Sequence, residues 1–191
     1  MCKEADRIVN FWVEEVGPKG WYKSTDALDS AIREEFGALW ECAAMGEYTA
    51  WLVSPQKALA LLILLDQFPR NMFRGEGKAF ASDSVALAVA KRAIVMGHDL
   101  KTPEPQRQFF YLPLMHSESL MDQERCVRLM ALRMPQAGAT QLQHARAHRD
   151  VIRQFGRFPY RNAALGRATT PAEAEYLKNG GYSSSVKANA A

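Results

Sequence analysis

The feature that most constrains the fold of this chain is an uninterrupted apolar segment over Ala58–Leu65. The dipeptide Ser54-Pro55 precedes it, and serine caps a helix N-terminus while proline suits the first helical turn. A helix without a polar face is buried on every side, so the sequence predicts a central helix over about 55–67. The Phe68-Pro69 pair is predicted to end this helix, because proline lacks a backbone N–H and clashes with the preceding turn.

The rest of the chain also shows the spacing of apolar residues that is typical of helices. Apolar residues recur three or four positions apart, and glycine, proline or polar residues separate these stretches. Further helices are expected over about 4–16, 26–45, 83–96, 108–112, 114–134, 138–155 and 171–179. The residues Ser24, Thr25 and Asp26 offer N-caps for the second of these. Without any strand-like alternation, the sequence predicts an all-α fold of about seven to nine antiparallel helices. We expect a single domain over residues 1–182 and a disordered tail over 183–191.

The amino-acid composition restricts the cellular compartment and the classes of binding partner expected for this protein. The three cysteines, Cys2, Cys42 and Cys126, have neither the number of a disulfide framework nor the spacing of a zinc site, which favours the cytoplasm. No signal peptide is expected, and the longest apolar run is too short to span a bilayer, so no membrane association is predicted. A net charge of +3 is too small to indicate nucleic-acid binding. The sequence leaves the oligomeric state open.

Two arginine-rich stretches, 66–74 and 155–167, share the pattern Phe-Pro followed closely by Arg-Asn. Guanidinium groups at this density need carboxylates, aromatic faces or a bound anion as partners. We therefore interpret the two stretches as walls of one polar site. Its candidate ligand-binding residues are Gln67, Arg70, Asn71, Arg74, Arg157, Tyr160, Arg161, Asn162 and Arg167.

Several polar residues lie on helix faces that are otherwise apolar. Asp66 continues the buried face of the central helix, and His116, Gln123 and His148 share stripes with core residues. Glu118 is expected in the first turn of its helix, where its charge suits the helix dipole. Buried polar groups need partners, so these side chains are candidates for a pocket. We assign possible catalytic roles to His116, His148, Asp66 and Glu118, and a ligand-binding role to Gln123.

No metal or cofactor is expected. His144 and His148 are four residues apart, a spacing that can chelate zinc, but the glutamate of a zinc-protease helix is missing. We interpret His144 as a surface residue beside a buried His148. Each buried polar residue taken alone favours a structural ion-pair network, whereas the whole set favours a ligand site, because a surplus of buried cations needs an anion.

The ordered motifs resemble one known family. They are Leu65–Asn71 with Phe73-Arg74, Pro113–Glu118 with Gln123, and His148 with Phe155–Asn162 and Leu165–Arg167. Over about residues 8–177 the chain resembles the bacterial domain-of-unknown-function 924 family. The resemblance implies an all-α fold similar to tetratricopeptide-repeat superhelices, and it implies no established activity. At Tyr160 the chain departs from the family's pattern, which usually has His there.

Three functions from different classes fit these features. The first is a pocket for a small phosphate- or carboxylate-bearing molecule, extended to a metal-independent enzyme if a histidine acts as general acid or base. The second is a tetratricopeptide-like scaffold that binds acidic peptides or proteins, its polar network being structural. The third, a nucleic-acid binder that stacks bases on aromatic residues, is disfavoured by the low net charge.

Overall fold

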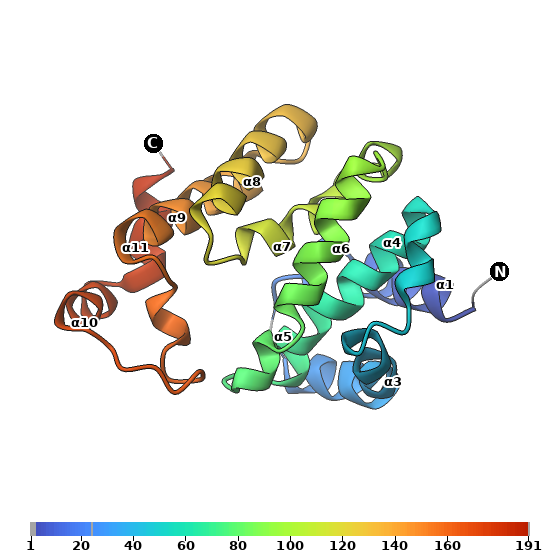
Figure 1. Ribbon diagram of the computed structural model, residues 1–191, viewed down its shortest axis with the longest axis horizontal. Helices are drawn as coiled ribbons and strands as arrows, with labels where there is room; N and C mark the ends of the chain where they lie inside the picture. The colour runs from blue at the N-terminus through green and yellow to red at the C-terminus, as the bar shows by residue number, and fades with distance from the viewer. Residues whose placement is uncertain (1–2, 24, 191) are drawn as a thin grey trace. The chain divides into compact units, whose positions relative to one another are not determined.

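The structure, a computed structural model, describes residues 3–23 and 25–190. Every regular element in these residues is helical and none is a strand, so the predicted all-α fold is confirmed. The chain forms two compact units, unit 1 over Met1–Pro113 and unit 2 over Leu114–Ala191, where the sequence analysis expected one domain (Figure 1). Across the described ranges, no helix is long and apolar enough to cross a membrane.

Unit 1 is built around the predicted central helix. Its elements are α1 (Lys3–Val9), η1 (Asn10–Val16), α2 (Gly17–Gly20), α3 (Asp26–Ala44), η2 (Thr49–Val53), α4 (Pro55–Leu62), η3 (Ile63–Gln67), α5 (Phe68–Met72), η4 (Gly77–Phe80), α6 (Asp83–Val95), η5 (Asp99–Lys101) and η6 (Gln106–Phe110). The segments α4, η3 and α5 follow one another without a break, and α1, α3 and α6 pack against them (Figure 1). Every residue from Ala58 to Leu65 is buried, as the absence of a polar face predicted.

The prediction that Phe68-Pro69 ends the central helix is wrong. The helix widens to a π-helix over Ile63–Gln67 and continues as α5 to Met72. Proline at 69 leaves the carbonyl of Leu65 without its usual helical donor. The Ser82 hydroxyl donates to that carbonyl at 2.6 Å, and it accepts from the Trp40 indole at 3.0 Å. A side chain from the start of α6 therefore compensates for the proline.

Replacing Ser82 by alanine is expected to destabilise the protein by about 1.5 kcal/mol, because the Leu65 carbonyl and the Trp40 N–H lose a buried partner. Urea denaturation followed by tryptophan fluorescence measures this loss. The exposed Ser84→Ala, in the same helical turn, is the matched control and is expected to change little. Equal stabilities of the two variants would contradict the proposed compensation.

The ends of the first two helices differ in how well they were predicted. Gly17 has a φ of 64°, which bends the chain after η1, but helical structure resumes as α2 with Pro18 in its first turn rather than stopping at Gly17-Pro18. Helix α3 begins as expected, and the Thr25 hydroxyl accepts a hydrogen bond from the backbone N–H of Leu28 at 3.2 Å. The alternative cap Ser24 lies outside the described residues.

Unit 2 contains two long neighbouring helices and shorter ones around them. Its elements are α8 (Leu120–Arg133), α9 (Ala139–Phe155), η7 (Pro159–Arg161), α10 (Pro171–Lys178) and α11 (Gly181–Ala188), and the short α7 (Leu112–Met115) crosses the boundary between the units. Helix α9 packs against both α8 and α11 (Figure 1). The capping box of Thr170 and Glu173 at the start of α10 is confirmed.

Two expectations about unit 2 are corrected. The helix predicted over 114–134 is interrupted, because α7 ends at Met115 and α8 begins only at Leu120. Helix α11 occupies residues for which a disordered tail was expected. Its backbone carbonyl at Val186 accepts a hydrogen bond from Gln143 Nε2 of α9 at 2.9 Å, which helps to hold it in place.

Candidate functional site

The candidate residues of the first arginine-rich stretch bind one another and nearby carboxylates within unit 1. Asp66 is buried, and the side-chain amide of Gln67 donates to its Oδ2 at 2.5 Å. Arg70 forms an ion pair with Asp66 at 3.4 Å and with Asp83 at 2.9 Å. Its Nη1 also donates to the Asp66 backbone carbonyl at 2.5 Å. These contacts tie the end of the central helix to the start of α6.

A second carboxylate, that of Asp29, binds side chains at the end of the first arginine-rich stretch. Asp29 of α3 accepts a hydrogen bond from Asn71 Nδ2 at 2.8 Å. It also accepts from Arg74 Nε at 3.1 Å and from Arg74 Nη2 at 3.2 Å, a two-point geometry typical of arginine–carboxylate pairs. Arg74 and Asn71 thus join α3 to α5, a structural role in this geometry.

In unit 2, Glu118 lies in the loop between α7 and α8 rather than in a helical turn. Its two oxygens accept from Arg167 at 2.8 and 3.1 Å, and the backbone N–H of Phe158 donates to Oε1 at 2.8 Å. Burial raises the pKa of Glu118, but the hydrogen bonds from Arg167 and Phe158 and the positive charges of Arg167 and Arg161 more than offset this effect. The net result is a pKa below the usual range, so Glu118 is ionised and is not placed to act as a general acid.

Glu173 of α10 forms the second two-point pair of unit 2. Arg157 donates to Oε1 at 2.6 Å and to Oε2 at 2.8 Å, and the backbone N–H of Thr170 donates to Oε2 at 2.7 Å. These contacts lower the pKa of Glu173 to about 2, with the Arg157 hydrogen bond as the largest cause. Asn162 connects the two pairs, because its Nδ2 lies 3.3 Å from Glu173 Oε2 and its Oδ1 accepts from Arg167 Nε at 3.0 Å.

Four of the candidate arginines are therefore paired with carboxylates of the chain itself. Their partners Asp29, Asp83 and Glu173 did not belong to the predicted site, and Glu173 was singled out only for its capping box. The argument that these arginines need an external anion does not hold for Arg70, Arg74, Arg157 and Arg167. Gln123 also has a structural role, since its Nε2 donates to the carbonyls of Met115 at 2.6 Å and Ser117 at 2.7 Å.

The other candidates of unit 2 converge on one group of rings, which we call the histidine cluster. Its members are His116, His144, His148, Phe158, Tyr160, Arg161 and Tyr182. The ring centroids of His116 and His148 are 6.1 Å apart, and Tyr182 lies 4.6 Å from His148. The helical period predicted inward faces for His116 and His148; His148 is buried, and His116 is half-buried.

The central imidazole of the cluster, His148, has a defined tautomer. Its Nδ1 lies 2.9 Å from the backbone carbonyl of His144, which can only accept, so Nδ1 carries the proton and Nε2 is the acceptor. The pKa of His148 is lowered to about 3, mainly by burial and also by the neighbouring charges of His116, Arg161 and His144, while the hydrogen bond to the His144 carbonyl opposes this shift. His148 is thus a neutral hydrogen-bond acceptor at neutral pH.

Arg161 brings a positive charge to the histidine cluster. The residue is 5% exposed, and its guanidinium carbon lies 4.5 Å from the centre of the Phe158 ring and 5.9 Å from that of Tyr160. A cation held over aromatic faces at such distances is stabilised by their quadrupoles. Tyr160 is 42% exposed, so the cluster reaches the surface at this ring.

Three members of the cluster, Phe158, His144 and Tyr182, were not among the predicted site residues. His144 was interpreted as a surface residue, but it is half-buried and its Nδ1 lies 2.6 Å from the Tyr182 hydroxyl. Its spacing of four residues from His148 already placed both on one helix face. Tyr182 gave no signal, because it was the last residue of the predicted domain and the residues after it were expected to be disordered. Among the residues that the structure describes, no group of three or more His, Cys, Asp or Glu side chains could hold a metal ion.

Comparison with known proteins agrees with the resemblance noted in the motifs. Residues 8–181 match the family described as bacterial protein of unknown function, DUF924. The chain belongs to this family. It is also similar to the solved structure of the protein of unknown function ATU0120 from Agrobacterium tumefaciens, with 42% identity, a TM-score of 0.86, and coverage of 92% of this chain and 97% of that one. No curated protein matches the chain.

Membership of this family does not indicate an activity, so the function has to be inferred from the side chains. The two arginine-rich stretches lie in different units. That they line one common site stays a prediction, as do the catalytic roles given to Asp66, Glu118, His116 and His148. Of the predicted residues, His116, His148, Tyr160 and Arg161 are the ones that meet in the histidine cluster.

Proposed function

We propose that unit 2 of this DUF924 protein binds a small anionic molecule, bearing phosphate or carboxylate, at the histidine cluster. The observation that carries the proposal is the neutral His148 acceptor fixed beside the cationic, aromatic-stacked Arg161. A ligand with a negative group and a hydroxyl or amine is complementary to this pair. Its anion attracts the guanidinium, and its donor suits the His148 acceptor.

Proton transfer is coupled to such binding. An anion next to His148 raises its pKa from the low value of the unliganded protein, and the imidazolium formed then donates to the ligand anion instead of accepting from a ligand hydroxyl or amine. The half-buried His116 ring lies 6.1 Å from the His148 ring. Such coupling suits a metal-independent acid–base enzyme, and proton uptake on ligand binding is the measurement that would support this role.

Thermal unfolding in the presence of small anions tests the proposal. Phosphate, a sugar phosphate, a nucleoside monophosphate, citrate and malate are compared with chloride at matched ionic strength. A ligand present at about one hundred times its dissociation constant stabilises the folded protein by about 2.7 kcal/mol. We expect one chemical class to raise the melting temperature, and Tyr160→Ala, at the exposed ring of the cluster, to reduce that shift.

The control for Tyr160→Ala is Leu165→Ala, a substitution of similar exposure outside the cluster. It is expected to keep the full ligand-induced shift. His148→Gln removes the titrating group and is expected to abolish proton uptake, measured by calorimetry in buffers of different ionisation enthalpy. The absence of any shift across the panel, in the wild-type protein, would refute the anion site.

A second candidate function is the scaffold that binds acidic peptides, and one observation favours it. The exposed face of α8 carries a shallow hollow of about 520 Å³ between Leu120, Met121, Glu124, Arg125 and Arg128. Met121 is 84% exposed, and two arginines adjoin it. An acidic peptide with an apolar side chain fits this composition. Binding of such a peptide that is lost in Met121→Ser and kept in Tyr160→Ala would support the scaffold.

A further inference from the structure

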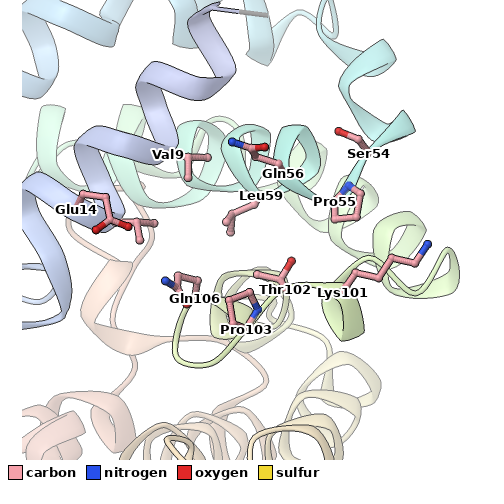
Figure 2. A pocket seen from close by; sticks show the side chains of 11 residues that line it. Val9, Glu14, Ser54, Pro55, Gln56, Leu59, Lys101, Thr102, Pro103 and Gln106 are labelled. Carbon is pink, nitrogen blue, oxygen red and sulfur yellow. The ribbon is translucent and has the colours of Figure 1, made fainter. Parts of the chain in front are cut away.

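The histidine cluster of unit 2 differs from a pocket of unit 1 in being covered by its own side chains. The unit 1 pocket has a volume of about 440 Å³, with Glu14 at one end and Lys101 at the other (Figure 2). These two charged groups are exposed and opposite in sign, so the lining singles out no ligand. The chemistry of the histidine cluster is more specific, but His148 is only 8% exposed. A ligand reaches the His148 ring only when a covering side chain moves.

Tyr182 is one of the side chains that cover His148. Its ring centroid lies 4.6 Å from that of His148, with an interplanar angle of 61°. The same ring stacks on His144 at 6.0 Å and 23°, and the Tyr182 hydroxyl lies 2.6 Å from His144 Nδ1. Ring contacts and a hydrogen bond therefore hold Tyr182 over both imidazoles.

Tyr182 belongs to α11, which is attached to the rest of unit 2 mainly through polar contacts. The one buried residue of α11 is Gly181, so no large apolar side chain anchors this helix in the core. Partly buried hydrogen bonds hold it in addition to that of Tyr182: Gln143 to the Val186 carbonyl at 2.9 Å, Tyr176 to Ser185 at 2.9 Å and Asn189 to Asp150 at 3.1 Å. An element with few buried apolar contacts opens at a lower free energy than the core of the same protein.

Two consecutive glycines join α11 to α10. Gly180 has a φ of 96° and Gly181 a φ of 50°, both in the left-handed region that other residues rarely adopt. Glycine also reaches the right-handed and extended regions at little cost, so this junction can change direction without distorting either helix. Hinges commonly absorb large changes of φ and ψ at a few such positions. Rotation at this junction moves α11 and carries Tyr182 away from His148.

We propose that α11 is a lid over the histidine cluster, which opens at Gly180-Gly181 and controls the access of ligands to His148. In the closed state the Tyr182 ring covers the imidazole, and in the open state the imidazole meets solvent and an entering molecule. The inference rests on the proposed anion site for the kind of ligand that enters. The opening itself is a property of the free protein and is measured without that ligand.

Two rates, measured on the whole chain at pH 7, test the lid. Hydrogen–deuterium exchange followed by mass spectrometry reports the opening of α11, whose amides are expected to exchange at least about tenfold faster than those of α9. Low concentrations of urea are expected to leave this exchange unchanged, because a lid exposes little surface when it opens. Carbethoxylation by diethyl pyrocarbonate, located by peptide mapping, reports access to His148. The buried His98 of unit 1 is the internal reference.

Tyr182→Phe connects the two rates. It keeps the covering ring and removes the hydrogen bond to His144. The exchange of α11 and the carbethoxylation of His148 are both expected to rise about fivefold, as suits the loss of one hydrogen bond. The control Tyr22→Phe removes a hydrogen bond of the same kind in unit 1 and is expected to change neither rate.

Gly180→Ala provides a second variant, because alanine is strained at the φ that the closed lid requires. It is also expected to raise both rates together. Gly97→Ala introduces the same kind of strain in unit 1, where φ is 69°, and is expected to leave both rates unchanged.

Parallel increases of the two rates in both lid variants support the proposal. Faster exchange of α11 with unchanged carbethoxylation of His148 shows that the helix frays without controlling access, and overturns it. Exchange of α11 that rises with urea as steeply as that of α9 also overturns it, because the helix then opens only when unit 2 unfolds. Carbethoxylation needs no bound anion, so a thermal panel without any shift refutes the anion site and leaves the lid to be decided by these two rates.

Discussion

Replacing Gln123 by glutamate is expected to destabilise unit 2 by about 4 kcal/mol at pH 7. The Gln123 side chain is fully buried, and its Nε2 donates to the carbonyls of Met115 at 2.6 Å and Ser117 at 2.7 Å. These carbonyls lie where the chain leaves helical geometry before α8, so the amide replaces backbone donors. The substitution puts an oxygen against two carbonyl oxygens and, when ionised, a buried negative charge beside them.

Urea denaturation followed by circular dichroism measures this effect, with the exposed Gln154→Glu of α9 as the matched control. The introduced carboxyl group has a folded-state pKa above its unfolded value of about 4.3, so the penalty is present at neutral pH and shrinks as the pH falls. A loss of stability no larger than that of the control would show that the loop between α7 and α8 does not depend on this amide.

Much of the helical framework could be predicted because it depends on local chemistry. The apolar run of the central helix, the Ser54 cap and the capping box of α10 each act within a few residues. Burial of Asp66, Gln123 and His148 followed from the helical period in the same way.

Two departures from prediction depend on side chains that replace backbone hydrogen bonds. The hydroxyl of Ser82, 13 residues after Pro69, donates to the backbone carbonyl that the proline leaves without a donor. No sequence pattern around the proline indicates this hydrogen bond. Gln123 was placed on a continuous helical stripe, although its amide in fact holds the carbonyls of the interrupted turn. A sequence period can describe one helix, but it cannot decide where side chains from another segment replace backbone hydrogen bonds.

The candidate site likewise combines features that the sequence indicates with contacts that only the structure reveals. Arginine-rich stretches indicated that anionic partners had to exist, but the number of arginines did not reveal whether those partners were ligands or carboxylates of the chain. Glu118 and Glu173 are 49 and 16 residues from the arginines that they pair with. Only the structure assigns these pairs, and it places the Arg161 guanidinium over the Phe158 ring of the histidine cluster.

Lowering the pH from 7 to 5 is expected to reduce the free energy of unfolding of unit 2 by about 2 kcal/mol through His148. Its pKa in the folded protein is about 3, against about 6.5 in an unfolded chain. The unfolded state therefore takes up a proton below about pH 6.5 that the folded state does not. The stabilisation is complete above pH 6.5 and is lost as the pH falls toward 3, by about 1.4 kcal/mol per pH unit.

Other groups around His148 do not reverse this sign. Burial also lowers the pKa of His144, which adds to the loss, and the positive charge of Arg161 opposes protonation of the folded state. Carboxylates titrate mainly below pH 5, so the interval from 7 to 5 isolates the histidines. Urea denaturation at intermediate pH values measures the slope, and His148→Gln is expected to remove most of it. A slope that persists in this variant would assign the pH dependence elsewhere, whereas a slope that weakens when an anion of the thermal panel is added would connect the buried imidazole to the proposed ligand site.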